Sequence, residues 1–202
     1  MDTTTHNDIA SLISSRICHD LISPLGAIGN GVELLGMAGT ADGPEMALIN
    51  ESVMNANARI RFFRIAFGAA KVNAQIGRSE IIAVLTDISA GGRLKFDWDS
   101  DQTLPRAQAK LAFLLILCFE TALPYGGTVE IRQCQTGWSL HCTAEQVKFD
   151  PAIWELLLVK NSERELSPAE VHFALVADVA KRAGCKLQTD LRENAITATF
   201  NP

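Results

Sequence analysis

The sequence predicts an α+β protein in which a long helical hairpin precedes a mixed unit of helices and strands. Apolar residues recur at three- and four-residue steps in two long segments near the N-terminus, joined by a short link rich in glycine. Segments in which apolar and polar residues alternate, as in strands, are concentrated in the second half of the chain. Shorter segments with helical periodicity stand between them, so we expect helices on one face of a mostly antiparallel sheet.

The first predicted helix runs from about Asp8 to Gly36, with Asn7 or Asp8 as its cap. One of its faces is apolar and should be buried; its residues are Ile13, Ile17, Leu21, Leu25 or Ile28, Val32 and Leu35. A turn rich in helix breakers over residues 37–43 ends this helix.

The second predicted helix begins at Pro44, after Asp42 or Gly43 as a cap, and extends to about Ala70. Its apolar residues follow alternating steps of four and three, a repeat typical of helix bundles: Ile49, Val53, Ala56, Ile60, Phe63 and Phe67. Two long helices with a short link form an antiparallel hairpin. Because a single hairpin buries little apolar surface, we expect two copies to pair as a four-helix bundle in a homodimer. An intramolecular bundle, or packing against the rest of the chain, is the alternative.

We predict that residues 1–76 form the helical hairpin and residues 77–202 a second, α/β sandwich domain. A polar connection over 71–79 leads into it. Its predicted helices are Glu80–Ala90, Pro105–Leu123, Pro151–Val159 and Ser167–Ala183. Its predicted strands are Leu94–Asp99, Thr128–Cys134, Trp138–Thr143, Lys186–Asp190 and Ala195–Phe200. The three tryptophans are expected in the core or at domain contacts.

Composition excludes several classes of function. A net charge of −5 argues against nonspecific binding to nucleic acid. No run of about 18 apolar residues predicts a membrane span, and the polar, acidic N-terminus lacks the features of a signal peptide, so we expect a cytoplasmic protein without a membrane partner. The five cysteines form no C-x-x-C pair and fall mostly in apolar segments, which favours buried free thiols over disulfides or a metal site.

The most informative residues are His19 and Asp20 on the first helix. An imidazole is a nitrogen nucleophile, and an adjacent carboxylate can orient the ring and accept proton density as the ring attacks. At about 100° per residue, His19 lies roughly 200° from Ile17 and therefore on the exposed side. Pro24 frees the backbone carbonyl of Asp20 and predicts a bend one turn beyond the histidine. A solvated histidine without function is the alternative.

The segment resembles the phosphoacceptor box of sensor histidine kinases, in which a histidine, an acidic residue, two variable residues, serine or threonine, proline and leucine follow one another. His19, Asp20, Ser23, Pro24 and Leu25 match every position. The resemblance implies a hairpin for dimerisation and histidine phosphotransfer.

The second half resembles the ATP-binding domain of histidine kinases, particularly over residues 113–131. Such kinases carry a magnesium-binding asparagine where this chain has Thr121, and a D-x-G-x-G motif where it has the glycine-free stretch 144–150. No glycine occurs over residues 138–183, so a glycine-rich lid is also missing. We therefore expect a degenerate domain that binds no ATP and no other cofactor or metal.

Nearly the whole chain resembles the ChpT family of alphaproteobacterial histidine phosphotransferases, most specifically over residues 18–35. This implies a phosphotransferase, not an ATP-dependent kinase, that moves a phosphoryl group through His19 between receiver domains of a hybrid histidine kinase and of response regulators. Magnesium is expected from the receiver. Two alternatives stay open: a divergent ATP-dependent histidine kinase, and a noncatalytic dimeric scaffold in which His19 is incidental.

The geometry of the hairpin also predicts a surface for receiver domains. If the chain folds back at about residue 41, His19 lies level with about residue 63, near three basic residues of the second helix: Arg59, Arg61 and Arg64. Basic groups there would attract an acidic receiver pocket. On the first helix the face of His19 is shared by Ser15, Ile22, Ser23 and Gly26. The alternative is that the arginines only face solvent or pair with Glu51 and its neighbours.

Overall fold

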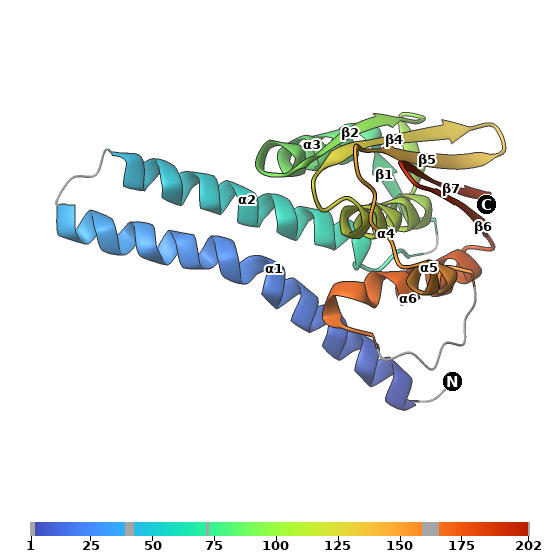
Figure 1. Ribbon diagram of the computed structural model, residues 1–202, viewed down its shortest axis with the longest axis horizontal. Coiled ribbons are helices and arrows are strands. Elements are labelled where there is room, and N and C mark those ends of the chain that lie inside the picture. Colours follow the sequence, from blue (N-terminus) through green and yellow to red (C-terminus); the bar gives the residue numbers. More distant parts are fainter. Residues whose placement is uncertain (1–2, 39–42, 72, 159–165, 202) are drawn as a thin grey trace.

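The computed structural model describes residues 3–38, 43–71, 73–158 and 166–201. The predicted α+β class is confirmed: two long helices project as a hairpin from a body of sheet and helices (Figure 1). The hairpin consists of α1 (Thr3–Ala38) and α2 (Pro44–Ala66). Helix α1 continues through Pro24, and Figure 1 shows its N-terminal part diverging from α2 toward α6 (Val171–Arg182).

Helix α2 begins as predicted, with Gly43 in an extended conformation before Pro44, but it ends at Ala66 rather than near Ala70. Side chains of α4 (Arg106–Ala122) reach the end of α2 and satisfy its last carbonyls, which another helical turn would otherwise do. Lys110 Nζ donates to the carbonyl oxygens of Phe67 and Gly68 at 3.3 and 2.8 Å. A guanidinium nitrogen of Arg106 donates to the carbonyl oxygen of Arg64 at 3.2 Å. The hairpin is thus fastened to the body where α2 ends.

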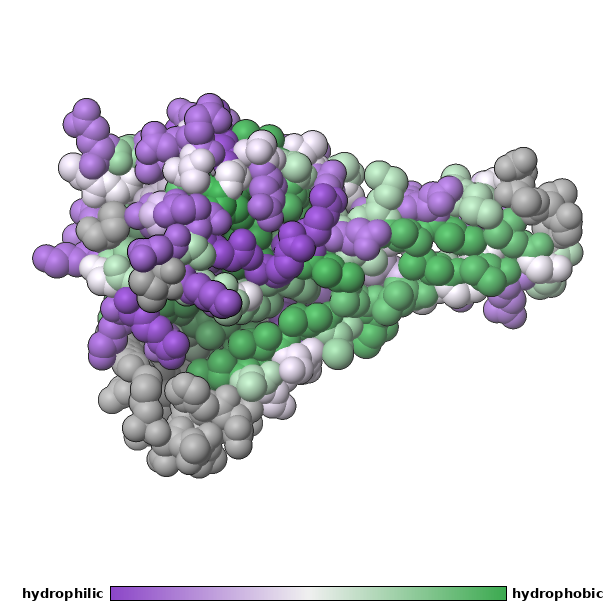
Figure 2. Space-filling model, turned by 180° about the vertical axis from the view of Figure 1, so that it is seen from behind, coloured by the Kyte–Doolittle hydropathy of each residue, from purple (hydrophilic) through white to green (hydrophobic). Residues whose placement is uncertain are grey.

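A single chain does not bury one whole apolar face along each hairpin helix, and the burial predicted for a four-helix bundle of two copies stays a prediction. On α1, Leu25 and Val32 are 58% and 57% exposed, and on α2, Val53 and Ile60 are 39% and 49% exposed. The reason is that α1 and α2 cover only a narrow strip of each other. Figure 2 shows the resulting band of apolar side chains along the hairpin.

The face of α2 that is buried turns instead toward the body. Its fully enclosed residues near the end of the helix are Ala58, Phe62, Phe63, Ile65 and Ala66. Helix α2 therefore carries two apolar faces, one enclosed by the body and one open to solvent.

The body holds a mixed five-stranded sheet beside helices. Its strands, in spatial order, are β2 (Leu94–Asp99), β4 (Gly127–Cys134), β5 (Gly137–Thr143), β7 (Ala195–Asn201) and β6 (Lys186–Arg192). Strands β2 and β4 are parallel, and the other neighbours are antiparallel. The helical elements are α3 (Arg78–Gly91), α4 (Arg106–Ala122), α5 (Pro151–Glu155), the 3-10 turn η1 (Pro168–Glu170) and α6 (Val171–Arg182).

Several element boundaries differ from the prediction. Two three-residue strands, β1 (Gln75–Gly77) and β3 (Thr103–Pro105), pair with each other and were not predicted, because so short a segment has no readable alternation. Pro105 closes β3, so α4 starts one residue later than predicted. Helix α5 ends at Glu155, short of the predicted end at residue 159, which lies outside the described residues.

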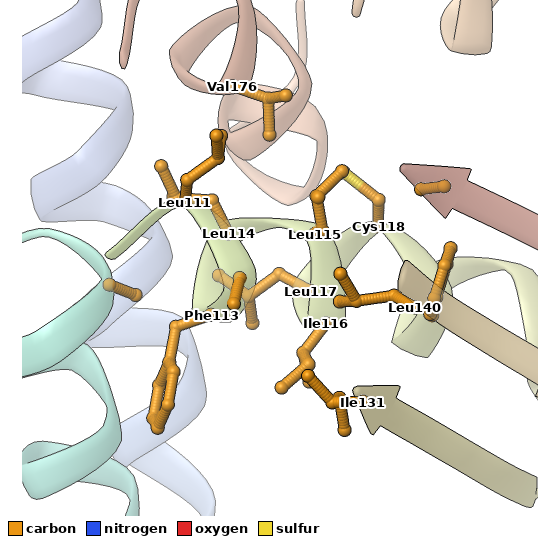
Figure 3. Packing of buried hydrophobic residues seen from close by; sticks show 14 of the residues in the cluster. Leu111, Phe113, Leu114, Leu115, Ile116, Leu117, Cys118, Ile131, Leu140 and Val176 are labelled. Carbon is orange, nitrogen blue, oxygen red and sulfur yellow. The ribbon is translucent and has the colours of Figure 1, made fainter. Parts of the chain in front are cut away.

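The core lies between α4, α6 and one face of the sheet. Helix α4 is buried on nearly all sides, and Figure 3 shows its side chains directed both toward Val176 of α6 and toward Ile131 and Leu140 of the sheet. On β4, Val129 and Ile131 are fully buried and Glu130 between them is exposed, so helices cover one face, as predicted. The tryptophans are core residues: Trp98, Trp138 and Trp154.

The five cysteines are free thiols, but they are not mostly buried. Cys118 and Cys142 are buried, and burial raises the pKa of both thiols, that of Cys142 to about 11. Cys18 and Cys134 are exposed, because one lies on the open side of α1 and the other ends β4. Within the described ranges, no helix combines the length and the apolar composition that a membrane span requires.

Candidate functional site

His19 stands on the open side of α1, as predicted, and its side chain is 84% exposed. The ring nitrogen Nδ1 lies 3.2 Å from Oδ1 of Asp20. A carboxylate can only accept a hydrogen bond, so Nδ1 carries the hydrogen in this arrangement. In the neutral ring the lone pair is then on Nε2, which makes Nε2 the nucleophilic atom.

Asp20 is turned inward, and its side chain is only 9% exposed. Its second oxygen, Oδ2, meets two guanidinium groups: Nε of Arg16 at 3.2 Å and Nε of Arg59 at 3.3 Å. Arg16 precedes Asp20 by one helical turn, whereas Arg59 comes from α2, which crosses α1 at this level. The two carboxylate oxygens thus have separate partners, with Oδ1 facing the histidine and Oδ2 the arginines.

Arg59 continues this chain of charges into the body. One of its terminal nitrogens lies 2.7 Å from Oε1 of Glu120 on α4. Burial alone would lower the pKa of Arg59, but the carboxylates of Glu120 and Asp20 outweigh burial and raise it. The guanidinium also lies over the ring of Phe63, with 5.5 Å to the ring centroid. Arg59 therefore joins Asp20 of the hairpin to Glu120 of the body through one guanidinium group.

Arg16 reaches the body as well. A terminal nitrogen of its guanidinium donates to the carbonyl oxygen of Ala169, in η1, at 3.2 Å. The turn η1 is itself fixed by a capping box between Ser167 and Glu170. Both arginines that hold Asp20 are thus anchored in the body.

The remaining predicted residues of the first helix lie open to solvent around His19. Pro24 is half-buried, whereas the others are exposed: Ser15, Ile22, Ser23 and Gly26. Ile22 is 66% exposed, and a Cβ atom added to Gly26 would meet nothing within 4 Å. These residues leave room for a partner beside the histidine.

The three predicted arginines separate. Of the three, only Arg59 contacts Asp20 beside His19. It lies about one helical turn before residue 63, which was predicted to be level with the histidine. Arg61 pairs with Asp87, and Arg64 lies 3.4 Å from Glu80; both carboxylates belong to α3. A role of Arg61 and Arg64 in partner binding stays a prediction.

Two members of the site were not predicted. Arg16 had a signal, because it stands four residues before Asp20, the spacing at which opposite charges meet on a helix. Glu120 had none, because it is far from Asp20 in sequence and the packing of α4 against α2 brings it near.

Thr121, which the resemblance places where kinases carry their asparagine, is exposed near the end of α4, but its hydroxyl already has partners within the protein. Its hydroxyl donates to the carbonyl oxygen of Leu117 at 3.1 Å and lies 3.3 Å from Nε2 of His172. Among the described residues, no group of three or more histidine, cysteine or acidic side chains is placed to hold a metal ion.

A family model described as "Histidine phosphotransferase C-terminal domain" matches residues 78–195, more than half of the chain. The chain belongs to the histidine phosphotransferase family. Protein phosphotransferase ChpT of Brucella abortus (strain 2308) is a relative of this histidine phosphotransferase, 43% identical over 127 residues. That match spans 62% of this chain and 60% of the Brucella protein's length.

Solved structures include a bacterial phosphotransferase that this histidine phosphotransferase resembles over its whole length. The TM-score is 0.80 at 32% identity, and the match covers 100% of this chain and 98% of the other. A histidine kinase domain from the blue-light-activated kinase of Erythrobacter litoralis gives a TM-score of 0.43 at 15% identity, over 96% of this chain and 90% of that one.

Proposed function

We propose that this protein is an intermediate of a phosphorelay, in which His19 accepts a phosphoryl group from the aspartyl phosphate of one receiver domain and passes it to another. The observation that supports this most is the exposed imidazole whose Nδ1 is held by Asp20. Membership of the histidine phosphotransferase family agrees with it.

The geometry assigns a role to each group in the transfer. The lone pair of His19 Nε2 attacks phosphorus in line, and the bond between phosphorus and the receiver's carboxylate oxygen breaks, so that this carboxylate leaves. As the ring becomes positively charged, the hydrogen bond from Nδ1 to Oδ1 of Asp20 stabilises it. Magnesium in the receiver's acidic pocket would neutralise the phosphoryl oxygens.

We further propose that the protein works without ATP. The hydroxyl of Thr121 is engaged by Leu117 and His172, and the sequence lacks the asparagine and glycines of a kinase nucleotide site. Magnesium-ATP should therefore leave the melting temperature unchanged, whereas a bound nucleotide would raise it.

The proposed partners are receiver domains and a second copy of this chain. Four exposed residues lie near His19 on α1, and a Cβ atom added to Gly26 would meet nothing within 4 Å, which leaves space for a partner helix: Ser15, Ile22, Ser23 and Gly26. The exposed apolar band of the hairpin supports pairing of two copies as a four-helix bundle. A relay between receiver domains would place the protein in the cytoplasm.

The proposal is tested by incubating the protein with a phosphorylated receiver domain and measuring acid-labile phosphate on the protein. The wild type should become labelled, and His19→Gln should fold but stay unlabelled. Labelling of His19→Gln would contradict the assignment of His19. Labelling of the wild type by ATP alone would favour a divergent kinase, and unchanged signalling in cells carrying His19→Ala would favour a noncatalytic scaffold.

A further inference from the structure

The carboxylate of Asp20 has two guanidinium partners in addition to the exposed ring of His19. Its Oδ2 lies within 3.3 Å of two guanidinium nitrogens, from Arg16 and Arg59, and the side chain is only 9% exposed. Hydrogen bonds between charged groups are short and directional, so two of them on one oxygen fix the rotation of the carboxylate. The other oxygen, Oδ1, is thereby kept at the Nδ1 atom of His19.

Each of these arginines is in turn fixed by the body of the protein. Glu120 of α4 holds Arg59 at 2.7 Å, and the carbonyl oxygen of Ala169 holds Arg16 at 3.2 Å. Two paths therefore connect the body to Asp20. One runs from Glu120 of α4 through Arg59 of α2, and the other runs from Ala169 of η1 through Arg16 of α1. The body, which we propose to be unable to bind ATP, lies one side chain away from the reacting histidine pair.

The charges of this cluster balance. Arg16 and Arg59 are opposed by Asp20 and Glu120, so the cluster beside the neutral ring carries no net charge. Removing the charge of Glu120 would leave Arg59 with Asp20 as its one remaining carboxylate. We expect the guanidinium then to shift toward Asp20 or toward solvent, and the carboxylate to lose its fixed orientation.

We propose that Arg59 and Arg16 are positioning residues for Asp20, and that Glu120 transmits the position of the body to them. The degenerate domain then contributes to phosphotransfer by orienting the imidazole of His19, not by binding a nucleotide. This inference rests on the proposed function of His19 and adds a role for the second half of the chain.

The chain offers a matched control. Arg61 of α2 pairs with Asp87 of α3, so this pair also joins the hairpin to the body, and it touches neither Asp20 nor His19. Glu120→Gln and Asp87→Asn each remove one charge from a junction pair while keeping the shape of the side chain. Only the first should alter the site.

The experiment compares the full-length wild type with Glu120→Gln, Arg59→Lys and Asp87→Asn. Transfer from a phosphorylated receiver is measured at saturating receiver, and receiver affinity is measured separately. Because a misplacement of about 1 Å can slow a reaction by about 100-fold, Glu120→Gln and Arg59→Lys should slow transfer by about 10- to 100-fold with affinity within about twofold. Arg59→Lys should slow transfer although it keeps the positive charge, because one ammonium cannot reach the carboxylates of both Asp20 and Glu120 as the planar guanidinium does.

Nitrogen NMR of His19 supplies a readout that does not depend on transfer. The wild type should show mainly the form with hydrogen on Nδ1, and Glu120→Gln a mixture of both neutral forms. Wild-type transfer together with a wild-type spectrum in Glu120→Gln would overturn the inference, as would an equal loss in Asp87→Asn, which would indicate a general effect of domain docking. Labelling of His19→Gln would instead overturn the proposed function and leave the NMR result standing.

Discussion

Thr121 of α4 and His172 of α6 share a hydrogen bond, with 3.3 Å between Oγ1 and Nε2; the histidine is fully buried, whereas the threonine is exposed near the end of α4. The hydroxyl hydrogen of Thr121 is donated to the carbonyl oxygen of Leu117, so the ring nitrogen Nε2 must be the donor in this contact. Nδ1 of His172 then carries a lone pair, and within the described part of the chain it has no hydrogen-bond partner. Burial, and to a smaller extent the charge of Arg16, lower the pKa of His172 to about 3.

The buried imidazole should make the fold sensitive to acid. Below about pH 6.5 the unfolded chain binds a proton at His172, whereas the folded chain does not until about pH 3, so stability falls as the pH falls through this range. At pH 5 the loss is about 2 kcal/mol. Urea unfolding of the wild type and His172→Gln at pH 7 and pH 5 checks this: the variant should lose less stability on acidification. The partly exposed His141→Gln is the control and should behave like the wild type.

Replacing Asp20 by asparagine should slow transfer more than it weakens binding. The amide keeps the size of the carboxylate but removes the charge that stabilises the imidazolium and that holds Arg16 and Arg59. We expect a loss of about 100-fold in the transfer rate, since a positioned proton acceptor contributes about 10²- to 10⁴-fold. Asp178→Asn removes the acidic partner of Arg182 on α6 and serves as control. An effect of Asp20→Asn on affinity alone would mean that Asp20 is only an interface residue.

Two glycines of α1 should respond oppositely to alanine. A Cβ atom on Gly31 would lie 2.4 Å from Cγ1 of Ile49 on α2, so the isoleucine side chain or the helices must shift, at a cost of about 1 to 3 kcal/mol. A Cβ atom on Gly29 would meet nothing within 4 Å, and alanine there should stabilise the helix by about 0.5 to 1 kcal/mol. Thermal unfolding should therefore give a lower melting temperature for Gly31→Ala than for Gly29→Ala. Equal melting temperatures would show that the two helices are not in close contact.

A charge in the apolar band of the hairpin should separate the proposed dimer. Val32 is 57% exposed, so glutamate there harms the single chain little but would be desolvated between two copies. Light scattering after size exclusion should give a dimer for the wild type and a monomer for Val32→Glu. Ile82→Glu, at another exposed apolar residue but on α3, should remain dimeric. A monomeric wild type would refute the predicted pairing.

A bulky side chain at Gly26 should block receiver binding. Gly26 is exposed, about two turns from His19, and leucine there would occupy the space a partner helix needs. Gly26→Leu should weaken receiver binding without loss of helical circular dichroism, whereas Gly36→Leu, at an equally open position nearer the tip of the hairpin, should bind normally. Normal binding by Gly26→Leu would show that the receiver binds elsewhere on the protein.

Local rules were enough to predict the helical hairpin, the five strands of the main sheet and the open position of His19. They failed where the decisive contact is distant. The end of α2 depends on Lys110, and the anchoring of Arg59 depends on Glu120; neither is near its partner in sequence. The exposure of Leu25 and Val32 could not be predicted either, because a repeat shows that a face is apolar but not whether the covering surface belongs to the same chain.

The fastening of α2 by Lys110 and Arg106 has a consequence for the rate of the proposed relay. Arg59 and Arg16 are joined to the body farther along the hairpin, and Arg61 pairs with Asp87 of α3, so the two halves of the chain are tied at several separate places. In the proposed relay, we expect a receiver to meet a surface that these contacts have already assembled. Little ordering entropy would then be spent on closing one half of the chain over the other, so the encounter of the two proteins, steered by charge, would set the rate of exchange.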